Sequence, residues 1–274
     1  AATARPSADS ANVEHFGARA GYLDSTSGIQ AAIQWASELP GGGTVRIPAG
    51  EFRSGPLQLL SGVTLFLEPG AVLQARADIE TWPRTEPLES YGGGREGSMR
   101  LRRVAFLSGM NVENVTITGD GGRIDGGGPD WWAFKGSPAF DNVTLPHLVE
   151  FLHSRNIHIS GVVLQNSPMW TVHPFDCTHF TVSGVRIENP VDVKNTDGIN
   201  PDSCRDVLIE NVVFTGGDDA VALKSGWDCF GDERGFNRPT KGVVIRNLTV
   251  LATSSAAIAI GSEMSGGVED VLIE

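Results

Sequence analysis

Short apolar segments with an alternating pattern recur along the chain, and this repeat constrains the fold more than any other feature. Alternation with period two indicates strands, because successive side chains of a strand point to opposite faces. The spacing drifts, with steps of 23, 27, 36 and 28 residues from Ile157 onward. This argues against leucine-rich and helical repeats and predicts an all-β parallel β-helix, a solenoid of short strands joined by turns of unequal length. The equivalent positions are Val115, Ile157, Phe180, Val207, Val243 and Val271.

Residues 27–39 give the one convincing helical pattern in the sequence. An open end of a β-helix exposes strand edges that invite pairing with another chain, so such an end needs a cover. We expect this N-terminal helix to cap the first coil and to end before Pro40. Its apolar face is formed by Ile29, Ile33, Ala36 and Leu39.

The pattern divides the chain into an N-terminal tail, residues 1–15, and a single β-helix domain, residues 16–274. A length of 274 residues suits one large domain with a continuous core. The last segment, "GGVEDVLIE", stops inside a strand pattern. We therefore expect the domain to be incomplete at its C-terminus and the natural protein to continue for further coils.

Composition excludes several classes of function. With 21 basic and 33 acidic residues, the net charge of −12 argues against a nucleic-acid partner. No apolar run reaches membrane-spanning length, so no membrane partner is expected. The CxxC, HExxH and P-loop patterns do not occur, and the sequence predicts no metal site and no cofactor.

A second alignment places aspartates on neighbouring coils. Neighbours in one column of a parallel stack lie roughly 4.8 Å apart. Asp197 and Asp219 are therefore expected to be adjacent, with Asp218 beside them. A solvated turn explains the pair Asp218–Asp219 but not the place of Asp197, so we predict that the three carboxylates form a catalytic cluster. When Val172, Ile199, Val221 and Ile258 are matched, the shared column holds Trp170, Asp197, Asp219 and Ala256.

The same register stacks Asp202 on Lys224 and His173 on Asn200. Lys224 has two interpretations, contact with an anionic substrate group or an ion pair with Asp202, and the ion pair is favoured. For His173, a packed and hydrogen-bonded side chain is favoured over a proton donor.

Two further features leave alternatives open. Cys177 and Cys204 occupy equivalent places, which allows either a disulfide or stacked free thiols. The segment 91–103 either lines a groove for a polyanion or is a solvated loop. Its arginines are Arg95, Arg100, Arg102 and Arg103.

The segments "NTDGINPDS" (195–203) and "GGDDAVALKSGWD" (216–228), supported by "IAIGSEMSGGV" (258–268), resemble glycoside hydrolase family 28, the polygalacturonases, in its plant-type and bacterial branch. The resemblance runs from about Phe16 to the last residue. It implies a right-handed parallel β-helix and inverting hydrolysis of α-1,4-galacturonosidic bonds in pectin. It also implies a cofactor-free protein, secreted or periplasmic, that is a monomer at full length.

The resemblance also implies roles for single residues. Asp218 would be the general acid that protonates the leaving oxygen. Asp197 and Asp219 would hold and deprotonate the attacking water. Such chemistry needs one protonated and one ionised carboxyl at the same pH, and we expect an acidic pH optimum. The residues expected to bind substrate are His173, Asn195 and Lys224.

This chain departs from the family pattern at three places. Ala256 stands where the family has the histidine of a Gly-His-Gly motif, and Leu145 stands where relatives often carry arginine. The Arg-x-Lys motif that contacts the substrate carboxylate belongs to a later coil, which this chain does not contain.

Two rival functions stay open at this stage. A pectate lyase would hold calcium with the same aspartates and would need a nearby base. A non-catalytic pectin-binding β-helix would bind the polysaccharide without cleaving it. Neither the choice between internal and terminal cleavage nor the preferred pectic polymer follows from the sequence.

Overall fold

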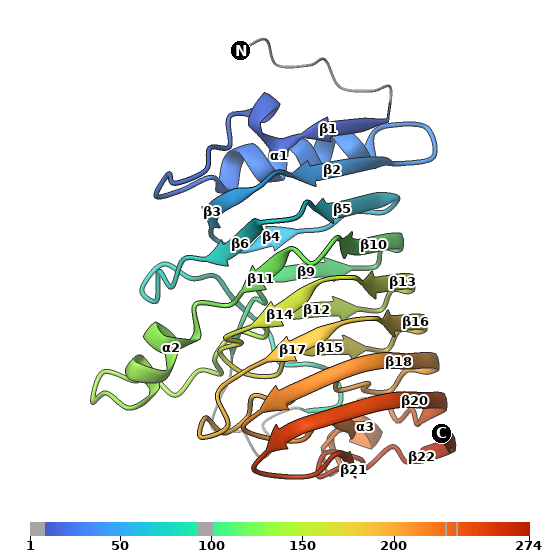
Figure 1. The fold of residues 1–274 in the computed structure, drawn as a ribbon. Coiled ribbons are helices and arrows are strands. Elements are labelled where there is room, and N and C mark those ends of the chain that lie inside the picture. The colour runs from blue at the N-terminus through green and yellow to red at the C-terminus, as the bar shows by residue number, and fades with distance from the viewer. Residues whose placement is uncertain (1–8, 92–100, 228, 234) are drawn as a thin grey trace.

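The computed structural model describes residues 9–91, 101–227, 229–233 and 235–274, which form coils stacked along one axis (Figure 1). One coil consists of β12 (Val149–Leu152), β13 (Arg155–Ser160) and β14 (Val163–Gln165). Each of these strands pairs in parallel with the equivalent strands of the coils before and after it. The stack therefore has three faces, and its backbone hydrogen bonds run along its axis.

The first two faces are joined into one sheet, because the long strand β18 pairs with β16 on one face and β17 on the other. The strands of the first face are β1 (Ser10–Asn12), β2 (Gly43–Ile47), β5 (Val63–Leu67), β10 (Glu113–Gly119), β13, β16 (Thr178–Ser183), β18 (Arg205–Gly216), β20 (Thr240–Thr253) and β22 (Val268–Ile273). Those of the second face are β3 (Gly50–Ser54), β6 (Ala71–Ala75), β11 (Arg123–Asp125), β14 and β17 (Arg186–Glu188).

The third face carries the strands that position the aspartates. Isolated bridges at Ile199 connect β15 to β19. The strands of this face are β4 (Leu57–Gln58), β9 (Leu107–Met110), β12, β15 (Val172–Phe175), β19 (Val221–Leu223) and β21 (Ile258–Ile260). Outside the three faces are the antiparallel pair β7 (Arg84–Thr85) and β8 (Arg102–Arg103), the 3-10 helix η1 (Val13–Phe16) and the short helix α3 (Phe230–Glu233).

The pairing register confirms both alignments read from the sequence. Because a shift of one residue would turn every side chain to the other face, this register also fixes which residues enter the core. The first column pairs Val115 with Ile157, Ile157 with Phe180, Phe180 with Val207, Val207 with Val243, and Val243 with Val271. The second pairs Val172 with Ile199, Ile199 with Val221, and Val221 with Ile258.

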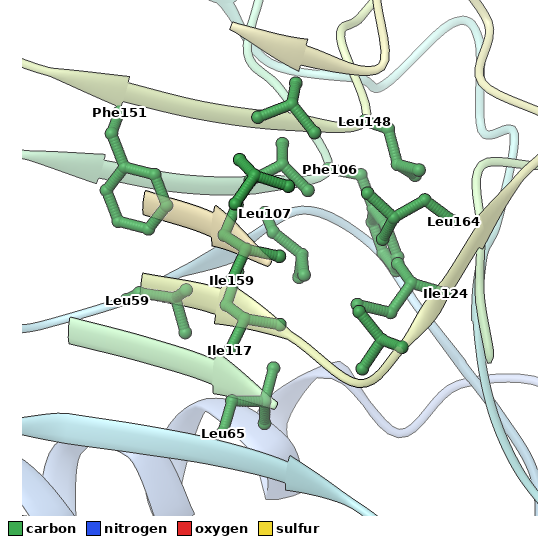
Figure 2. Close-up of a cluster of buried hydrophobic side chains, with 14 of the residues drawn as sticks. Leu59, Leu65, Phe106, Leu107, Ile117, Ile124, Leu148, Phe151, Ile159 and Leu164 are labelled. Carbon is green, nitrogen blue, oxygen red and sulfur yellow. The ribbon is translucent and has the colours of Figure 1, made fainter. Parts of the chain in front are cut away.

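Apolar side chains from all three faces fill the interior and form one continuous core (Figure 2). Ile117 and Ile159 come from the first face, Ile124 and Leu164 from the second, and Phe151 from the third. All five side chains are fully buried, and each such burial contributes about 1.5–3 kcal/mol. The buried side chains of each coil pack against those of the coils before and after it. The coils therefore depend on one another for stability.

Helix α1 (Thr26–Ser37) covers the N-terminal end of the stack, as expected for the segment 27–39 (Figure 1). It ends two residues earlier than the pattern indicated. Its buried residues are Gly28, Ile29, Ala32, Ile33 and Ala36, and Leu39 is partly exposed beyond the helix end. Within the segment 1–15, for which we expected a tail, Ser10–Asn12 pair with β2, so paired structure begins before residue 16.

The corners of the coils use residues in the left-handed backbone region. The residue before each position of the first column has a positive φ, for example Asn114 at 57°, Asn156 at 54° and Asp206 at 56°. Asparagine and aspartate tolerate this region better than other non-glycine residues, because their short side chains hydrogen-bond locally. Asn156 accordingly donates from Nδ2 to Oδ1 of Asn114, 3.2 Å away on the preceding coil. The corners are thus specified by residue type as well as by turn length.

Helix α2 (Gly128–Lys135) was not expected from the sequence, because its apolar residues do not follow a helical period. It is held to the stack by Trp131, which is fully buried and packs edge-on against Trp82. Among the described residues, no helix is both long enough and apolar enough to cross a membrane.

Truncation of a core side chain in the first column is expected to destabilise the fold strongly. Phe180 is fully buried between Ile157 and Val207, and Phe180→Ala should lower the free energy of unfolding by about 3–5 kcal/mol. Phe66 lies on the outer face of β5 under the Arg46 guanidinium, and Phe66→Ala should cost about 1 kcal/mol or less. Urea unfolding of both variants measures the difference, and equal losses would contradict the assigned register.

Candidate active site

Asp197, Asp218 and Asp219 converge at the start of the strands of the third face, as the register predicted. One carboxylate oxygen from each lies within 4.8 Å of the others. The backbone sets this arrangement, since Asp197 and Asp219 each precede a paired residue, Ile199 and Val221, by two positions. Like charges this close repel one another, and the carboxylates of Asp218 and Asp219 disfavour ionisation of Asp197.

Two of the aspartates are partly exposed and are oriented by hydrogen bonds from the backbone. Asp218 accepts from the N–H of Asn195 at 3.0 Å and from the N–H of Asp219 at 3.1 Å, one bond to each oxygen. Oδ1 of Asp219 accepts from the Ser255 hydroxyl at 2.6 Å and from the N–H of Ala256 at 3.0 Å. Both carboxylates are therefore fixed by neighbouring loops rather than by long side chains.

Asp197 is different because it is only 3% exposed. Its Oδ2 accepts from Nδ2 of Asn200 at 3.2 Å, while Oδ1 is buried with no hydrogen-bond partner among the described residues. Burial raises the pKa of Asp197 to about 7; the neighbouring aspartates add to the rise and the Lys224 ammonium opposes it. At mildly acidic pH this carboxyl therefore holds a proton.

Lys224 does not pair with Asp202, and the favoured prediction for it is wrong. The two residues do lie in register, but Nζ of Lys224 is 2.6 Å from Oε2 of Glu263 and 4.4 Å from the ring centroid of Trp170. The long lysine side chain reaches a carboxylate outside its own rung of the sheet. Burial acts in the opposite direction, yet the Lys224 ammonium holds the pKa of Glu263 below its usual value.

His173 is a packed, hydrogen-bonded side chain, as its favoured interpretation stated. It is 1% exposed, with Nδ1 3.0 Å from Oε1 of Glu150 and Nε2 3.3 Å from Oδ2 of Asp202. Burial works against protonation, but these two carboxylates raise the pKa of His173 above its usual value. A contact between His173 and a substrate requires one of these bonds to open.

Oδ2 of Asp202 also accepts a hydrogen bond from the Tyr91 hydroxyl, at 2.5 Å. Nδ1 of His147, which stacks on Trp170, is buried without a partner among the described residues, and burial lowers the pKa of His147 to about 3. A buried polar network therefore lies behind the aspartates. The sequence analysis named Arg102 only as part of the arginine segment, and the members of the network that it missed are Tyr91, His147, Glu150 and Glu263.

Of the two interpretations of the arginine segment, the solvated loop is wrong for Arg102 and Arg103, which are buried, whereas Arg102 does line a pocket together with Glu150. Arg102 is buried and donates from Nη1 to both oxygens of Glu150, at 2.7 and 2.6 Å. Arg103 is 1% exposed, pairs with Asp141 and lies over the Trp131 ring. Arg95 and Arg100 lie outside the described residues. The register itself held a clue, because it sets Glu150 beside His173 on the next coil.

The side chains of Cys177 and Cys204 are free and buried, which decides between the two alternatives for them. The Cys177 N–H lies 3.4 Å from Sγ of Cys204, as in a ladder of stacked thiols. Burial raises the pKa of Cys204 well above its usual value, so the thiol stays protonated.

Among the described residues, two groups of side chains have the composition of metal sites. One is the aspartate cluster, and the other is His147, Glu150 and His173, whose ligand atoms also lie within 4.8 Å of one another. In the second group both oxygens of Glu150 accept from Arg102, so a cation there would have to displace a guanidinium. The aspartate cluster is the better match for a hard, oxygen-binding cation.

Residues 43–271 match the family described as Glycosyl hydrolases family 28. The chain belongs to this family. It is 44% identical over 271 residues to a probable polygalacturonase of Vitis vinifera, covering 97% of this chain and 54% of the relative. It is 30% identical over 218 residues to an endo-polygalacturonase of Pectobacterium parmentieri, covering 73% of this chain and 51% of that protein. The chain thus spans about half the length of the curated relatives it matches.

Solved structures of polygalacturonases superimpose on most of the chain. The hyperthermoactive exopolygalacturonase of Thermotoga maritima matches with a TM-score of 0.83 at 29% identity, covering 98% of this chain and 66% of that one. The polygalacturonase of Erwinia carotovora ssp. carotovora matches with a TM-score of 0.73 at 28% identity, covering 100% of this chain and 69% of that one. These similarities confirm the predicted fold class, a right-handed parallel β-helix.

Replacement of Asp197 is expected to stabilise this family-28 fold above mildly acidic pH. Folding raises the pKa of Asp197 from 3.8 to about 7, so in that interval the folded state binds a proton that the unfolded state has released. The free energy of unfolding therefore falls as the pH rises through the interval, and Asp197→Asn removes that loss. At pH 8 the free energy of unfolding of Asp197→Asn should exceed that of wild type by on the order of a few kcal/mol, and this difference should vanish near pH 4.

Urea unfolding of wild type and Asp197→Asn at both pH values measures the effect. The exposed Asp120 provides a control, since Asp120→Asn removes the same formal charge away from the cluster. A stability difference between Asp197→Asn and wild type that is independent of pH would contradict the assigned proton.

Proposed function

We propose that the protein hydrolyses α-1,4-galacturonosidic bonds of pectic galacturonan. The observation that carries this proposal is the aspartate cluster in a family-28 chain, with three carboxylate oxygens within 4.8 Å of one another. Glycoside hydrolysis by a pair of carboxyls needs one that is protonated and one that is ionised. A coupled cluster containing one buried acid meets this requirement, because burial and like charges keep a proton in the site.

In the proposed active form the cluster holds one proton. In the free site this proton resides on Asp197, because burial raises the pKa of that carboxyl to about 7. The protonated form then predominates under mildly acidic conditions, which supports an acidic optimum. The basic limb of the pH profile is set by the loss of this proton.

Asp218 is the proposed proton donor to the leaving oxygen. In this proposal the single proton of the cluster passes from Asp197 to Asp218 when substrate binds, which leaves Asp197 ionised and able to accept the proton of the attacking water. Asp218 is partly exposed, so a sugar can reach it, and its orientation is fixed by the N–H groups of Asn195 and Asp219. Asp197 and Asp219 are proposed to hold the attacking water between them. The buried Oδ1 of Asp197, which has no partner among the described residues, provides an acceptor for that water.

Inversion at the anomeric carbon rests on the family resemblance and not on the spacing. Inverting enzymes usually separate their two carboxyls by about 6.5–9.5 Å, which is wider than the 4.8 Å found here. With three carboxylates, the water can be bound by two of them on the side of the sugar away from Asp218. The anomeric form of the first product, followed by NMR, decides between inversion and retention.

Asn195 and Lys224 are the proposed substrate contacts at the cluster. Asn195 is partly exposed and its N–H already contacts Asp218. Lys224 is buried beside Trp170, so its charge acts on Asp197 and on a bound uronate at short range. His173 is proposed to contribute through Asp202 and Glu150, which it connects, rather than by direct contact.

The calcium-dependent lyase is not favoured. The aspartate cluster has suitable ligand atoms, but elimination also needs a base, and the lysine beside Asp197 is held by Glu263 at 2.6 Å. A family-28 match over residues 43–271 supports hydrolysis. A protein that only binds pectin does not need a protonated Asp197, so the non-catalytic alternative is not favoured either.

We also propose that the protein acts outside the cytoplasm, where pectic polysaccharide is found, and that the full-length protein is a monomer. The names of its relatives support a polymeric substrate of this kind. A polyanionic substrate is repelled by a protein of net charge −12, so the cations near the cluster are needed to offset that repulsion.

Asp218→Asn is expected to lower turnover on polygalacturonate by about 10²–10⁴-fold, because it removes the proton donor. The variant should unfold at the same urea concentration as wild type, since Asp218 is partly exposed. Release of reducing ends from defined galacturonan oligomers measures the rate, and Asp120→Asn should behave as wild type. Near-normal activity of Asp218→Asn would assign the acid to another residue. An unsaturated, ultraviolet-absorbing product that disappears with a chelator would establish the lyase instead.

Lys224→Met is expected to move the basic limb of kcat/KM to higher pH by about one unit, because the lysine charge opposes protonation of Asp197. Glu263→Gln should move the limb the other way, since it removes the negative charge that offsets Lys224. Lys224→Arg keeps the charge and should leave the limb near its place. Profiles of kcat/KM between about pH 3 and about pH 9 on the same oligomers test this. If Lys224→Met and Glu263→Gln had their basic limbs at the same pH, Lys224 would not control the protonation of Asp197.

A further inference from the structure

The helix α2 brings a lysine to the edge of the aspartate cluster. Nε1 of Trp132 donates to the carbonyl of Pro168 at 3.2 Å, and the N–H of Gly128 to the carbonyl of Asn166 at 2.9 Å, so the helix is fixed to the coil before the cluster. Figure 1 shows α2 projecting from the side of the stack. Lys135 is its last residue. The helix therefore has a defined position from which this side chain extends.

Lys135 contacts the same asparagine that positions the proposed acid. Its Nζ lies 3.4 Å from Oδ1 of Asn195, a long hydrogen bond, and the Asn195 N–H donates to Asp218. Lys194, the residue before Asn195, is also exposed. Asn195 thus has one lysine in contact with its side chain and another directly before it in the sequence.

These two lysines differ from most basic residues of the chain in having no carboxylate partner among the described residues. By contrast, Lys224 pairs with Glu263 and Lys241 with Glu269. In a chain with net charge −12, exposed cations that have no carboxylate partner among the described residues can pair with an external anion. The long bond to Asn195 is weak enough to be exchanged for a charge-assisted one.

We propose that Lys135 and Lys194 form a carboxylate-binding subsite that takes the uronate group of a sugar unit next to the cleaved bond. The proposal rests on the proposed function and extends it to specificity. Because Asn195 links the subsite to Asp218, binding of that carboxylate also holds the sugar chain in place at the proton donor. The substrate class this subsite selects is a polymer with a carboxylate on adjacent units, in preference to a methyl-esterified one.

Steady-state kinetics on polygalacturonate test the subsite with Lys135→Met, Lys194→Met and the double variant. Loss of one such contact at an exposed site is expected to raise KM about three- to tenfold with a much smaller change in kcat. The double variant should also show a weaker dependence of KM on salt, because fewer charges take part in binding. Lys135→Arg, which keeps the charge, should restore most of the affinity.

Lys241→Met is the matched control, since it changes the net charge by the same amount at an exposed lysine that is paired with Glu269. A KM that rises equally in this control would assign the effect to net charge and overturn the subsite. An unchanged KM in both methionine variants of an active protein would overturn it as well.

Failure of the proposed function gives a different result, in which wild type releases no reducing ends. Binding of polygalacturonate, measured by calorimetry, then replaces kinetics. Weaker binding by the methionine variants than by wild type and Lys241→Met would support the subsite without hydrolysis, and equal binding by all of them would overturn it.

Discussion

Parallel pairing on the third face is the constraint on which the site depends. The register that pairs Val172 with Ile199, Ile199 with Val221 and Val221 with Ile258 aligns successive coils on this face. The position of each aspartate follows from its distance in sequence from the paired residue of its coil. A shift of one residue in any of these strands would turn the side chains to the other face and separate the carboxylates. The free energy that holds this register comes from the continuous core, so the stability of the coils and the geometry of the cluster have one source.

The cluster itself opposes folding, and the surrounding charges limit that cost. Burial makes an ionised Asp197 unfavourable, while the Lys224 ammonium beside it lowers the penalty. Lys224 is buried in turn, and it is tolerable there because Glu263 and the Trp170 ring accept its charge. Removal of one member leaves another buried charge without a partner. The charges of the site are therefore coupled. This explains why removal of the Lys224 charge and removal of the Glu263 charge should shift the proton affinity of Asp197 in opposite directions.

The sequence predicted the strand register and the meeting of the three aspartates, because both follow from the period of apolar residues. It did not predict the partner of Lys224, since register gives the heights of Cα atoms and a long side chain reaches beyond its own rung. It also failed for Arg102 and for α2, which are placed by insertions between coils and not by the repeat. Buried polar pairs from such segments leave no periodic pattern to read.

Ala256 shows how the same constraint bears on the departures from the family pattern. It lies one rung beyond Asp219 and donates its backbone N–H to Oδ1 of that carboxylate at 3.0 Å, while the Ser255 hydroxyl donates to the same oxygen at 2.6 Å. Any residue except proline supplies that N–H, so the absence of a histidine side chain at this position leaves the orientation of Asp219 intact. The geometry of the three acids therefore does not depend on the side chain at position 256.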